Sequence, residues 1–366
     1  MQTSTRSSAR GGTRSILVLA LTLAAAGGGT PAAAGTAHGA TPAGSILYVK
    51  NHDIYAVTPD GRTTRRITHD GGAATHDRTG GVGYRSPSAS SNGTIVVAYR
   101  NQRVSPMDTQ GYLHVMNRNG AKIRTIHPLQ FGTHTVKTQP CFTKTQPRGI
   151  ANAAVSPDGK HIVYTVLENV IGADCSAGVD FDTVVINTNG TGATLIKRAN
   201  GDANMLEMGL WVTSTRVLLD NDFVGMQAFY YADLPSHIAR TWVQSGDAAD
   251  STYGTPVLRG GKLASGGISP NTGEPVVRLW TTSGPPARPS MRCELDSPVQ
   301  SDWPGSFGWS PSAGGLTYSI GTGGSKAAEG VYVLQVGSTV TSSSCHSPRL
   351  LVHGATDSFW APTNLA

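Results

Sequence analysis

The chain is poor in charged and aromatic residues for its length. Of its 366 residues, 14% are charged and 7% are aromatic, and the formal net charge is +6. No basic run with interleaved aromatic residues occurs. The sequence therefore gives no support to nucleic-acid binding, which depends on clustered Lys and Arg.

Long hydrophobic runs are also missing. The longest apolar stretch, Ile16–Ala26, is shorter than the roughly 20 residues of a transmembrane helix. Three arginines precede it, and small residues follow up to Ala34 and Ala40. This pattern predicts a secretory signal peptide over residues 1–40, and hence a secreted or extracytoplasmic protein without a membrane span. Removing it leaves 26 basic against 23 acidic residues, a net charge of only +3.

Cysteine is scarce, and none of it is arranged for metal binding. The four residues are Cys141, Cys175, Cys293 and Cys345, with no C-x-x-C spacing. An even number in an exported chain favours disulfides over free thiols. The spacing argues against a zinc–thiolate site.

Familiar catalytic fingerprints and helical periodicity are absent as well. There is no G-x-S-x-G elbow, H-E-x-x-H motif, P-loop or Rossmann fingerprint, so we expect neither a peptidase of the prolyl-oligopeptidase type nor a bound cofactor. No helical period of ten or more residues follows the signal segment. The 45 glycines and 21 prolines favour many short strands joined by turns.

What is present is a repeated phrase. Residues 154–165 read AVSPDGKHIVYT, and related phrases begin at Ala89 (ASSNGTIVVAY), Ile268 (ISPNTGEPVVRLW), Trp309 (WSPSAGGLTYS) and Phe359 (FWAP). Each pairs a small or aromatic residue and a turn with a strand-like run. The phrases recur with a period of roughly 40–60 residues, and such a period indicates a repeat architecture.

A second set of hairpins alternates with the first. Residues 53–68, 112–126 and 182–196 each contain two predicted strands, in which apolar and polar residues alternate, around a Pro-Asp-Gly or Asn-Gly turn. Asp-Gly and Asn-Gly turns are strong hairpin signals because these residues accept positive φ. Together the two hairpins predict a unit of four antiparallel strands.

Counting these units gives six. They span about 86–127, 150–198, 210–243, 263–296 and 306–352, and residues 46–68 supply three strands of another. We expect Ser358–Pro362 to complete that unit beside Ile46–Val49. The predicted fold over residues 41–366 is therefore all-β, a six-bladed β-propeller of four-stranded antiparallel blades whose first blade is closed by both termini. Two stacked β-sandwiches would leave the period unexplained.

The phrases SPDGKHIVYT and DIYAVTPDGRTTRRIT resemble the repeats of TolB-like propellers, and the resemblance covers nearly the whole chain after the signal segment. It implies a six-bladed propeller, in agreement with the count. TolB itself carries a further domain before its propeller, whereas here the first repeat begins shortly after the predicted cleavage site. The role of TolB in the Tol–Pal system is therefore not implied.

Ser156–Gly159 has a structural interpretation as a turn between two strands. A sialidase Asp-box places its Asp and Gly at alternating positions before Thr-Trp, and this sequence does not. We place such short turns at one end of the propeller and the longer connections, including 69–85, 100–111, 166–181, 244–262 and 282–290, at the other. We expect the ligand at the loop-rich end, because long loops on a rigid scaffold commonly carry function.

Several residues at the loop-rich end are candidates for binding. His69, Asp70, His76 and Asp77 together form a ligand set for a metal, although ordinary loop chemistry is favoured and no metal is predicted. Carboxylates gather near the predicted channel mouth, and Trp303 is the candidate for exposed aromatic recognition. The carboxylates are Asp180, Asp182, Asp220, Asp222 and Asp357. Trp211, Trp309 and Trp360 are interpreted as packing residues of the innermost strands.

Two functions follow. The favoured one is a non-catalytic exported monomer that binds a protein, a peptide or a cell-wall glycan. The alternative is a glycan hydrolase or lyase using His and carboxylate groups at the channel mouth. No catalytic residue is assigned.

Topology also predicts the disulfides. Cys141 and Cys175 both belong to loops of the third unit at the loop-rich end. Cys293, placed in or near the third strand of the fifth unit, and Cys345, in the outer part of the sixth, lie in neighbouring outer regions. Any crossed pairing would span the channel, so we expect Cys141–Cys175 and Cys293–Cys345.

Overall fold

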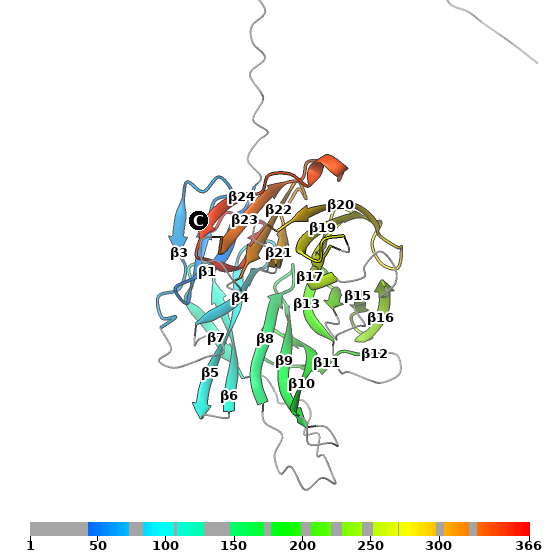
Figure 1. Ribbon diagram of the computed structural model, residues 1–366. Coiled ribbons are helices and arrows are strands. Elements are labelled where there is room, and N and C mark those ends of the chain that lie inside the picture. Colours follow the sequence, from blue (N-terminus) through cyan, green and yellow to red (C-terminus); the bar gives the residue numbers. More distant parts are fainter. Residues whose placement is uncertain are drawn as a thin grey trace, which may run out of the picture. The chain divides into compact units, whose positions relative to one another are not determined.

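The described residues of the computed structural model are 43–72, 83–105, 108–127, 147–171, 177–198, 206–220, 229–243, 252–269, 271–297, 304–321 and 328–366. They form six β-sheets, which we number as blades from the N-terminus (Figure 1). No helix among them has the length and apolar character of a membrane span.

In each blade the strands are named from the innermost to the outermost. Blade one contains β25 (Thr356–Ala361), β1 (Ser45–Lys50), β2 (Asp53–Val57) and β3 (Thr64–Arg66). Blade two contains β4 (Tyr84–Ala89), β5 (Ile95–Ser105), β6 (Asp108–Asn117) and β7 (Lys122–Ile126). Blade three contains β8 (Pro147–Val155), β9 (His161–Ile171), β10 (Ala177–Asn187) and β11 (Thr194–Leu195).

Blade four contains β13 (Glu207–Thr213), β14 (Arg216–Asp220), β15 (Phe229–Asp233), β16 (Ile238–Val243) and β12 (Lys197–Arg198). Blade five contains β17 (Thr252–Arg259), β18 (Lys262–Ile268), β19 (Pro275–Thr281) and β20 (Ser290–Asp296). Blade six contains β21 (Pro304–Trp309), β22 (Gly315–Ile320), β23 (Gly330–Gln335) and β24 (Arg349–His353), with the short 3-10 helix η1 (Ser342–Ser344) before β24.

The C-terminal strand closes blade one as predicted. β25 pairs antiparallel with β1, and Trp360 lies opposite Ile46. Figure 1 shows the blue N-terminal strands beside the red C-terminal ones. The innermost strands contact one another in the order β25, β4, β8, β13, β17 and β21, and β21 contacts β25 again. This closed ring confirms the six-bladed propeller.

Each innermost strand carries a β-bulge against the second strand of its blade. In three blades the bulge contains a residue other than glycine with positive φ: Ser86 (45°), Ser306 (50°) and Asp357 (52°). A bulge bends its strand and redirects a side chain. The repeated bulges therefore place comparable residues at one level of the channel.

The repeated Ser-Pro-Asp-Gly phrase is a structural turn, as predicted. Ser156 Oγ donates to Asp158 Oδ1 at 2.7 Å, and the amide of His161 donates to Ser156 Oγ at 2.9 Å. Gly159 has φ of +75°, which glycine adopts without steric cost. Ser90 and Asn92 reproduce the same network in blade two.

The prediction for blade five was wrong in its strand assignment. Its innermost strand is β17, within a segment expected to be an inter-blade loop, and β17 turns into β18 through Gly260 and Gly261. The SPNTG phrase instead joins β18 to β19, at the opposite end from the SPDG turns. Cys293 consequently lies in β20, the outermost strand, rather than in the third strand.

Three other expected connections also differ. Residues 100–111 and 166–181 belong largely to the long hairpins β5–β6 and β9–β10. Residues 282–290 join β19 to β20 at the end that carries the short turns. In addition, blade four gains a fifth strand, because β12 pairs parallel to β16 with Lys197 opposite Ile238.

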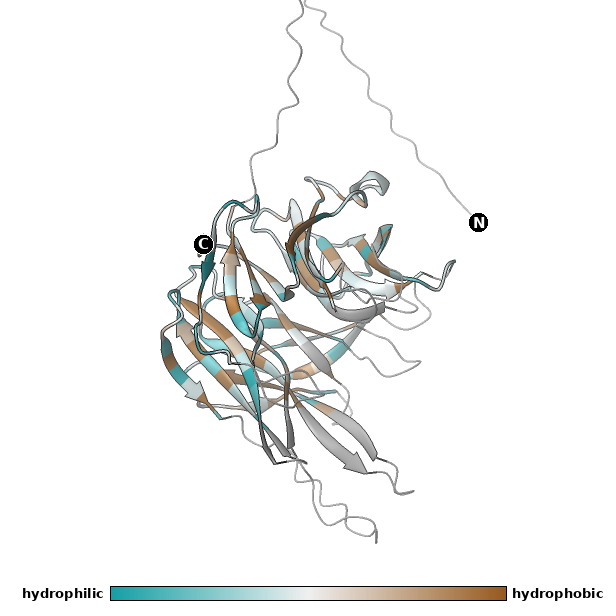
Figure 2. Ribbon diagram, turned by 60° about the vertical axis from the view of Figure 1, so that its left-hand side comes forward, coloured by the Kyte–Doolittle hydropathy of each residue, from teal (hydrophilic) through white to brown (hydrophobic). Residues whose placement is uncertain are grey.

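Apolar side chains fill the space between neighbouring blades, and Figure 2 shows brown hydrophobic residues along the strands. Two of the three predicted packing tryptophans are buried, Trp309 at 4% exposure and Trp360 at 2%. The indole of Trp309 donates to the carbonyl of Val257 in the preceding blade at 3.1 Å. Trp211 donates in the same way to Ala154 at 2.9 Å, but it remains partly exposed.

Candidate functional site

Among the described residues, two cavities lie in the channel between the innermost strands, separated by apolar side chains. Leu210, Phe307 and Phe359 line both cavities. We call the cavity toward the short turns the channel mouth from here on; the mouth considered in the sequence analysis lies at the opposite, loop-rich end. The cavity has a volume of about 90 Å³. That is several times the roughly 10–15 Å³ that one water requires, so the channel mouth has room for an apolar side chain.

The channel mouth is lined mainly by apolar residues of the innermost strands. Trp211 lies at its rim, with Val212 and Leu258 beside it. The other lining residues include Pro157, Pro256, Trp309, Trp360 and Pro362. An apolar cavity of this kind favours an apolar group of a ligand, because burying that group removes its surface from water.

A larger cavity opens beside the channel mouth, between the turns of blades four and five. We call it the turn-end groove; its volume is about 690 Å³, within the roughly 300–1,000 Å³ typical of ligand sites. Much of its lining consists of hydroxyl-bearing residues and glycines of the turns: Thr213, Ser214, Thr215, Gly260, Gly261, Ser283 and Gly284. Trp211, Val212, Leu258 and Arg259 line both the groove and the channel mouth. The two cavities are therefore adjacent parts of one surface.

Of the two arginines that line the turn-end groove, one is paired with a carboxylate among the described residues and the other is not. Arg216 makes two hydrogen bonds to Asp233, at 2.7 and 2.9 Å, and a third to the carbonyl of Pro285. Arg259 donates through Nε to the carbonyl of Pro311 at 3.0 Å, and no carboxylate among the described residues forms an ion pair with it. The hydrogen bond to Asp233 raises the pKa of Arg216, whereas desolvation lowers the pKa of Arg259. The described part of the groove thus carries one uncompensated positive charge.

The cavity on the other side of the apolar layer is small and polar, with a volume of about 40 Å³. Ser86, Ser306 and Asp357, the bulge residues with positive φ, line it. Asp357, a predicted site residue, accepts a hydrogen bond from Arg85 at 3.0 Å. Its carboxylate is therefore held in an ion pair within the protein.

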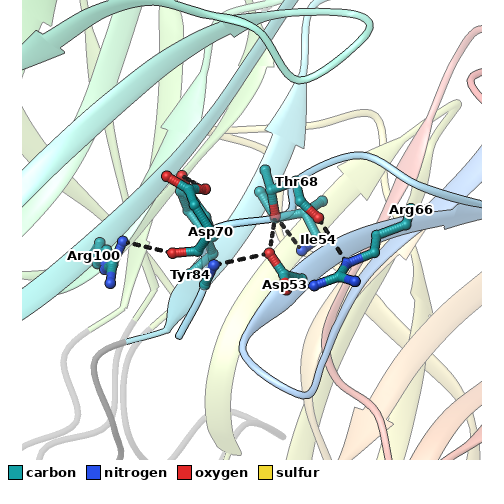
Figure 3. Close-up of polar contacts among 8 residues, drawn as sticks. Asp53, Ile54, Arg66, Thr68, Asp70, Tyr84 and Arg100 are labelled. Atoms are coloured by element: carbon teal, nitrogen blue, oxygen red, sulfur yellow. Dashed lines mark hydrogen bonds and ion pairs between the residues drawn. The ribbon is translucent and has the colours of Figure 1, made fainter. Parts of the chain in front are cut away.

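Of the four candidate metal ligands around His69, Asp70 is engaged in other contacts (Figure 3). His69 is exposed. The Asp70 carboxylate accepts hydrogen bonds from Tyr84 at 2.8 Å and from Lys122 at 2.5 Å. Although desolvation by partial burial opposes the shift, these hydrogen bonds lower the pKa of Asp70. Asp53, which sequence reasoning missed, accepts from Thr68 at 2.7 Å.

The remaining predicted residues are not brought together into one site. Asp220 is buried at the end of β14, and Asp182 is buried in β10. Asp180 lies opposite Glu168 in the β9–β10 hairpin. Within the described ranges, no three His, Cys, Asp or Glu side chains form a metal-binding group. His76, Asp77, Asp222, Trp303, Cys141 and Cys175 lie outside the described residues.

The disulfide between Cys293 and Cys345 is present as predicted, with a Cα–Cα distance of 5.9 Å. It joins β20 of blade five to the residue after η1 of blade six. The pairing of Cys141 with Cys175 stays a prediction.

Neither a protein-family model nor a curated protein sequence matches the chain. Solved structures do match in fold. TolB from Acinetobacter baumannii has a TM-score of 0.51 and 11% identity, covering 87% of this chain and 67% of that one. A TolB-like protein from Agrobacterium tumefaciens has a TM-score of 0.48 and 12% identity, covering 88% and 94%. A chain of the nidogen–laminin complex has a TM-score of 0.49 and 11% identity, covering 86% and 93%. The chain is therefore a six-bladed propeller similar in structure to that of TolB.

Proposed function

We propose that this protein is an exported, non-catalytic binding propeller that holds a peptide segment of a partner at its turn end. The observation that carries the proposal is the continuity of the polar turn-end groove with the apolar channel mouth through Trp211 and Leu258. A peptide can lay its backbone in a polar groove and insert a side chain into an apolar cavity. The closed ring of blades is a rigid scaffold, and the connections on such a scaffold commonly carry binding sites.

The ligand is proposed to bind at the turn end, whereas sequence reasoning expected the loop-rich end. Every short turn of the turn end lies within the described residues, while many loop-rich connections lie outside them. The glycan remains a competing ligand. The mainly apolar side chains that line the channel mouth favour a peptide with an apolar side chain, because burying that side chain removes its surface from water.

The enzyme alternative has no specific observation in its favour among the described residues. Asp357 is paired with Arg85, and Asp220 is buried. These two residues therefore do not suggest the pair of carboxylates, at a defined separation, that glycoside hydrolysis requires.

Selection from a random linear peptide library tests the proposal. Ser283 is exposed in the groove, so Ser283→Trp should obstruct the groove without disturbing a buried contact. We expect wild-type protein to enrich peptides that Ser283→Trp does not bind. Ser338→Trp, in an exposed turn of blade six, is the matched control and should retain binding. Equal enrichment by Ser283→Trp and wild type would place the ligand elsewhere. If no peptide is enriched and defined oligosaccharides, assayed separately, bind, the glycan is favoured.

A further inference from the structure

The turn-end groove is polar, whereas the adjacent channel mouth is mainly apolar. A ligand that fills both cavities must therefore carry polar and apolar groups close together. Arg259 lines both cavities, next to Leu258 and Trp211. One side of Arg259 faces an apolar cavity of about 90 Å³, and the other side faces a polar groove of about 690 Å³. A ligand that fills both cavities therefore contacts Arg259.

The charge at this junction is not balanced by the described residues. The charged residues that line the two cavities are Arg216, Asp233 and Arg259. Arg216 and Asp233 lie opposite each other in β14 and β15 and neutralise each other through two hydrogen bonds. Within the described part of the chain, Arg259 donates only through Nε, toward Pro311, which leaves its terminal amino groups available for a carboxylate. Guanidinium and carboxylate groups match each other in geometry and charge.

We infer that Arg259 selects a carboxylate of the bound peptide, next to an apolar side chain that enters the channel mouth. The carboxylate has two chemical sources, the free C-terminus of the peptide or an Asp or Glu side chain. This inference rests on the proposed peptide-binding function. It goes beyond that function by naming the residue that sets specificity and the pair of groups it recognises.

Three synthetic probes separate these sources. The first is acetyl-Ser-Gly-Ser-Leu with a free C-terminal carboxylate, and the second is the same peptide as its C-terminal amide. The third is acetyl-Ser-Gly-Asp-Leu amide, whose only carboxylate is a side chain. Their affinities for the full chain are measured by calorimetry or by ligand-detected NMR. Replacing Leu by Ser in the tightest probe tests the apolar anchor without changing the protein.

We expect one of the two carboxylate probes to bind about tenfold or more tightly than the neutral amide, the loss expected when a charged hydrogen bond is removed. Arg259→Gln should remove this preference, and Arg259→Lys should keep part of it. Arg62→Gln, an exposed arginine at the turn end of blade one, is the charge-matched control and should leave it unchanged. Raising the salt concentration should reduce the preference.

The outcomes distinguish this inference from the proposed function. If all three probes bind equally, and binding is lost in Ser283→Trp but not in Arg259→Gln, the groove binds peptides and the carboxylate inference is wrong. If the carboxylate preference persists in Arg259→Gln, another residue provides it and the inference is also overturned. If neither the probes nor any library peptide binds wild-type protein, the proposed function itself fails.

Discussion

At the scale of single residues, His114 is an unused titratable group inside blade two. It is 7% exposed, packs edge-on against Tyr84 at 5.5 Å and contacts Thr125 Oγ1 at 3.2 Å. Burial lowers the pKa of His114 to about 4, and the nearby cations Lys122 and Arg100 add to this effect while Asp70 opposes it. Its neutral form is therefore the one that the folded protein accommodates.

The stability of the protein should consequently fall as the pH decreases from about 6.5 toward 4. Unfolded His114 takes up a proton near its ordinary pKa of about 6.5, whereas the folded residue does so only near 4. The unfolded state binds more protons in this window, so protonation favours unfolding. The full difference corresponds to about 3 kcal/mol as an upper bound. The contribution is complete above a pH of about 6.5 and is lost as the pH falls.

Urea denaturation at a series of pH values measures this effect. His114→Gln should flatten the dependence of the unfolding free energy on pH between about 6.5 and 4. His69→Gln removes an exposed histidine and should not change it. If wild type and His114→Gln lose stability in parallel, the acid sensitivity belongs to other groups.

At the scale of strands and turns, the two glycines between β17 and β18 are the signal that fixes blade five. Gly260 and Gly261 have φ of 55° and 74°, as in a two-residue hairpin turn with positive φ at both positions. A Cβ at Gly261 would also approach the carbonyl oxygen of Thr282 to 3.0 Å. Gly261→Ala should therefore destabilise the protein by about 1–2 kcal/mol.

Chemical denaturation again provides the measurement, with Gly305→Ala as the control. Gly305 lies in β21, its φ is outside the positive range, and a Cβ there would meet no atom within 4 Å. This variant should keep the wild-type stability to within about 0.5 kcal/mol. Equal losses for the two glycines would show that backbone conformation is not the cause.

The sequence predicted the blades whose turns use the repeated side-chain network, and it failed where the network is replaced. In blade three, Ser156 and Asp158 build the turn through their own side chains, so the phrase itself reveals the structure. In blade five, Gly260 and Gly261 form the corresponding turn without any side chain. The SPNTG phrase there forms a turn at the other end of the blade, so the blade was counted correctly but its strands were assigned with a shift.

The candidate site could not be predicted from the sequence because it lies where the repeated phrase is weak or replaced. The turn-end groove is built by blades four and five, where the repeats are weakest, and Arg259 ends the strand that was expected to be a loop. The pairing of Arg216 with Asp233 depends on the register of β14 and β15. Which arginine is neutralised and which is left for a ligand is therefore visible only once the strands are paired. Sequence patterns locate turns well, but they do not assign charge partners.

At the scale of the whole molecule, the propeller is a ring, and a ring depends on its closing contact. β25 supplies the innermost strand of blade one and contacts β4 and β21 in the two neighbouring blades. Trp360 and Ala361 in β25 are buried, and Ser45 Oγ accepts hydrogen bonds from the amides of Leu365 and Ala366 at 2.8 and 3.1 Å. The disulfide Cys293–Cys345 joins blades five and six, but it does not span this closure.

Deleting residues 356–366 should therefore open the ring and abolish cooperative unfolding. The deletion exposes the paired edge of β1 and the apolar surfaces of blades six and two, and unpaired strand edges promote aggregation. We expect the truncated protein to aggregate and to lose the single denaturation transition of the full chain, as observed by circular dichroism and size-exclusion chromatography. Adding a synthetic peptide of residues 354–366 should restore the monomeric elution position, while a scrambled peptide of the same composition should not. A truncated protein that unfolds at the wild-type denaturant concentration would show that the ring is held by its other blade contacts and that β25 is dispensable.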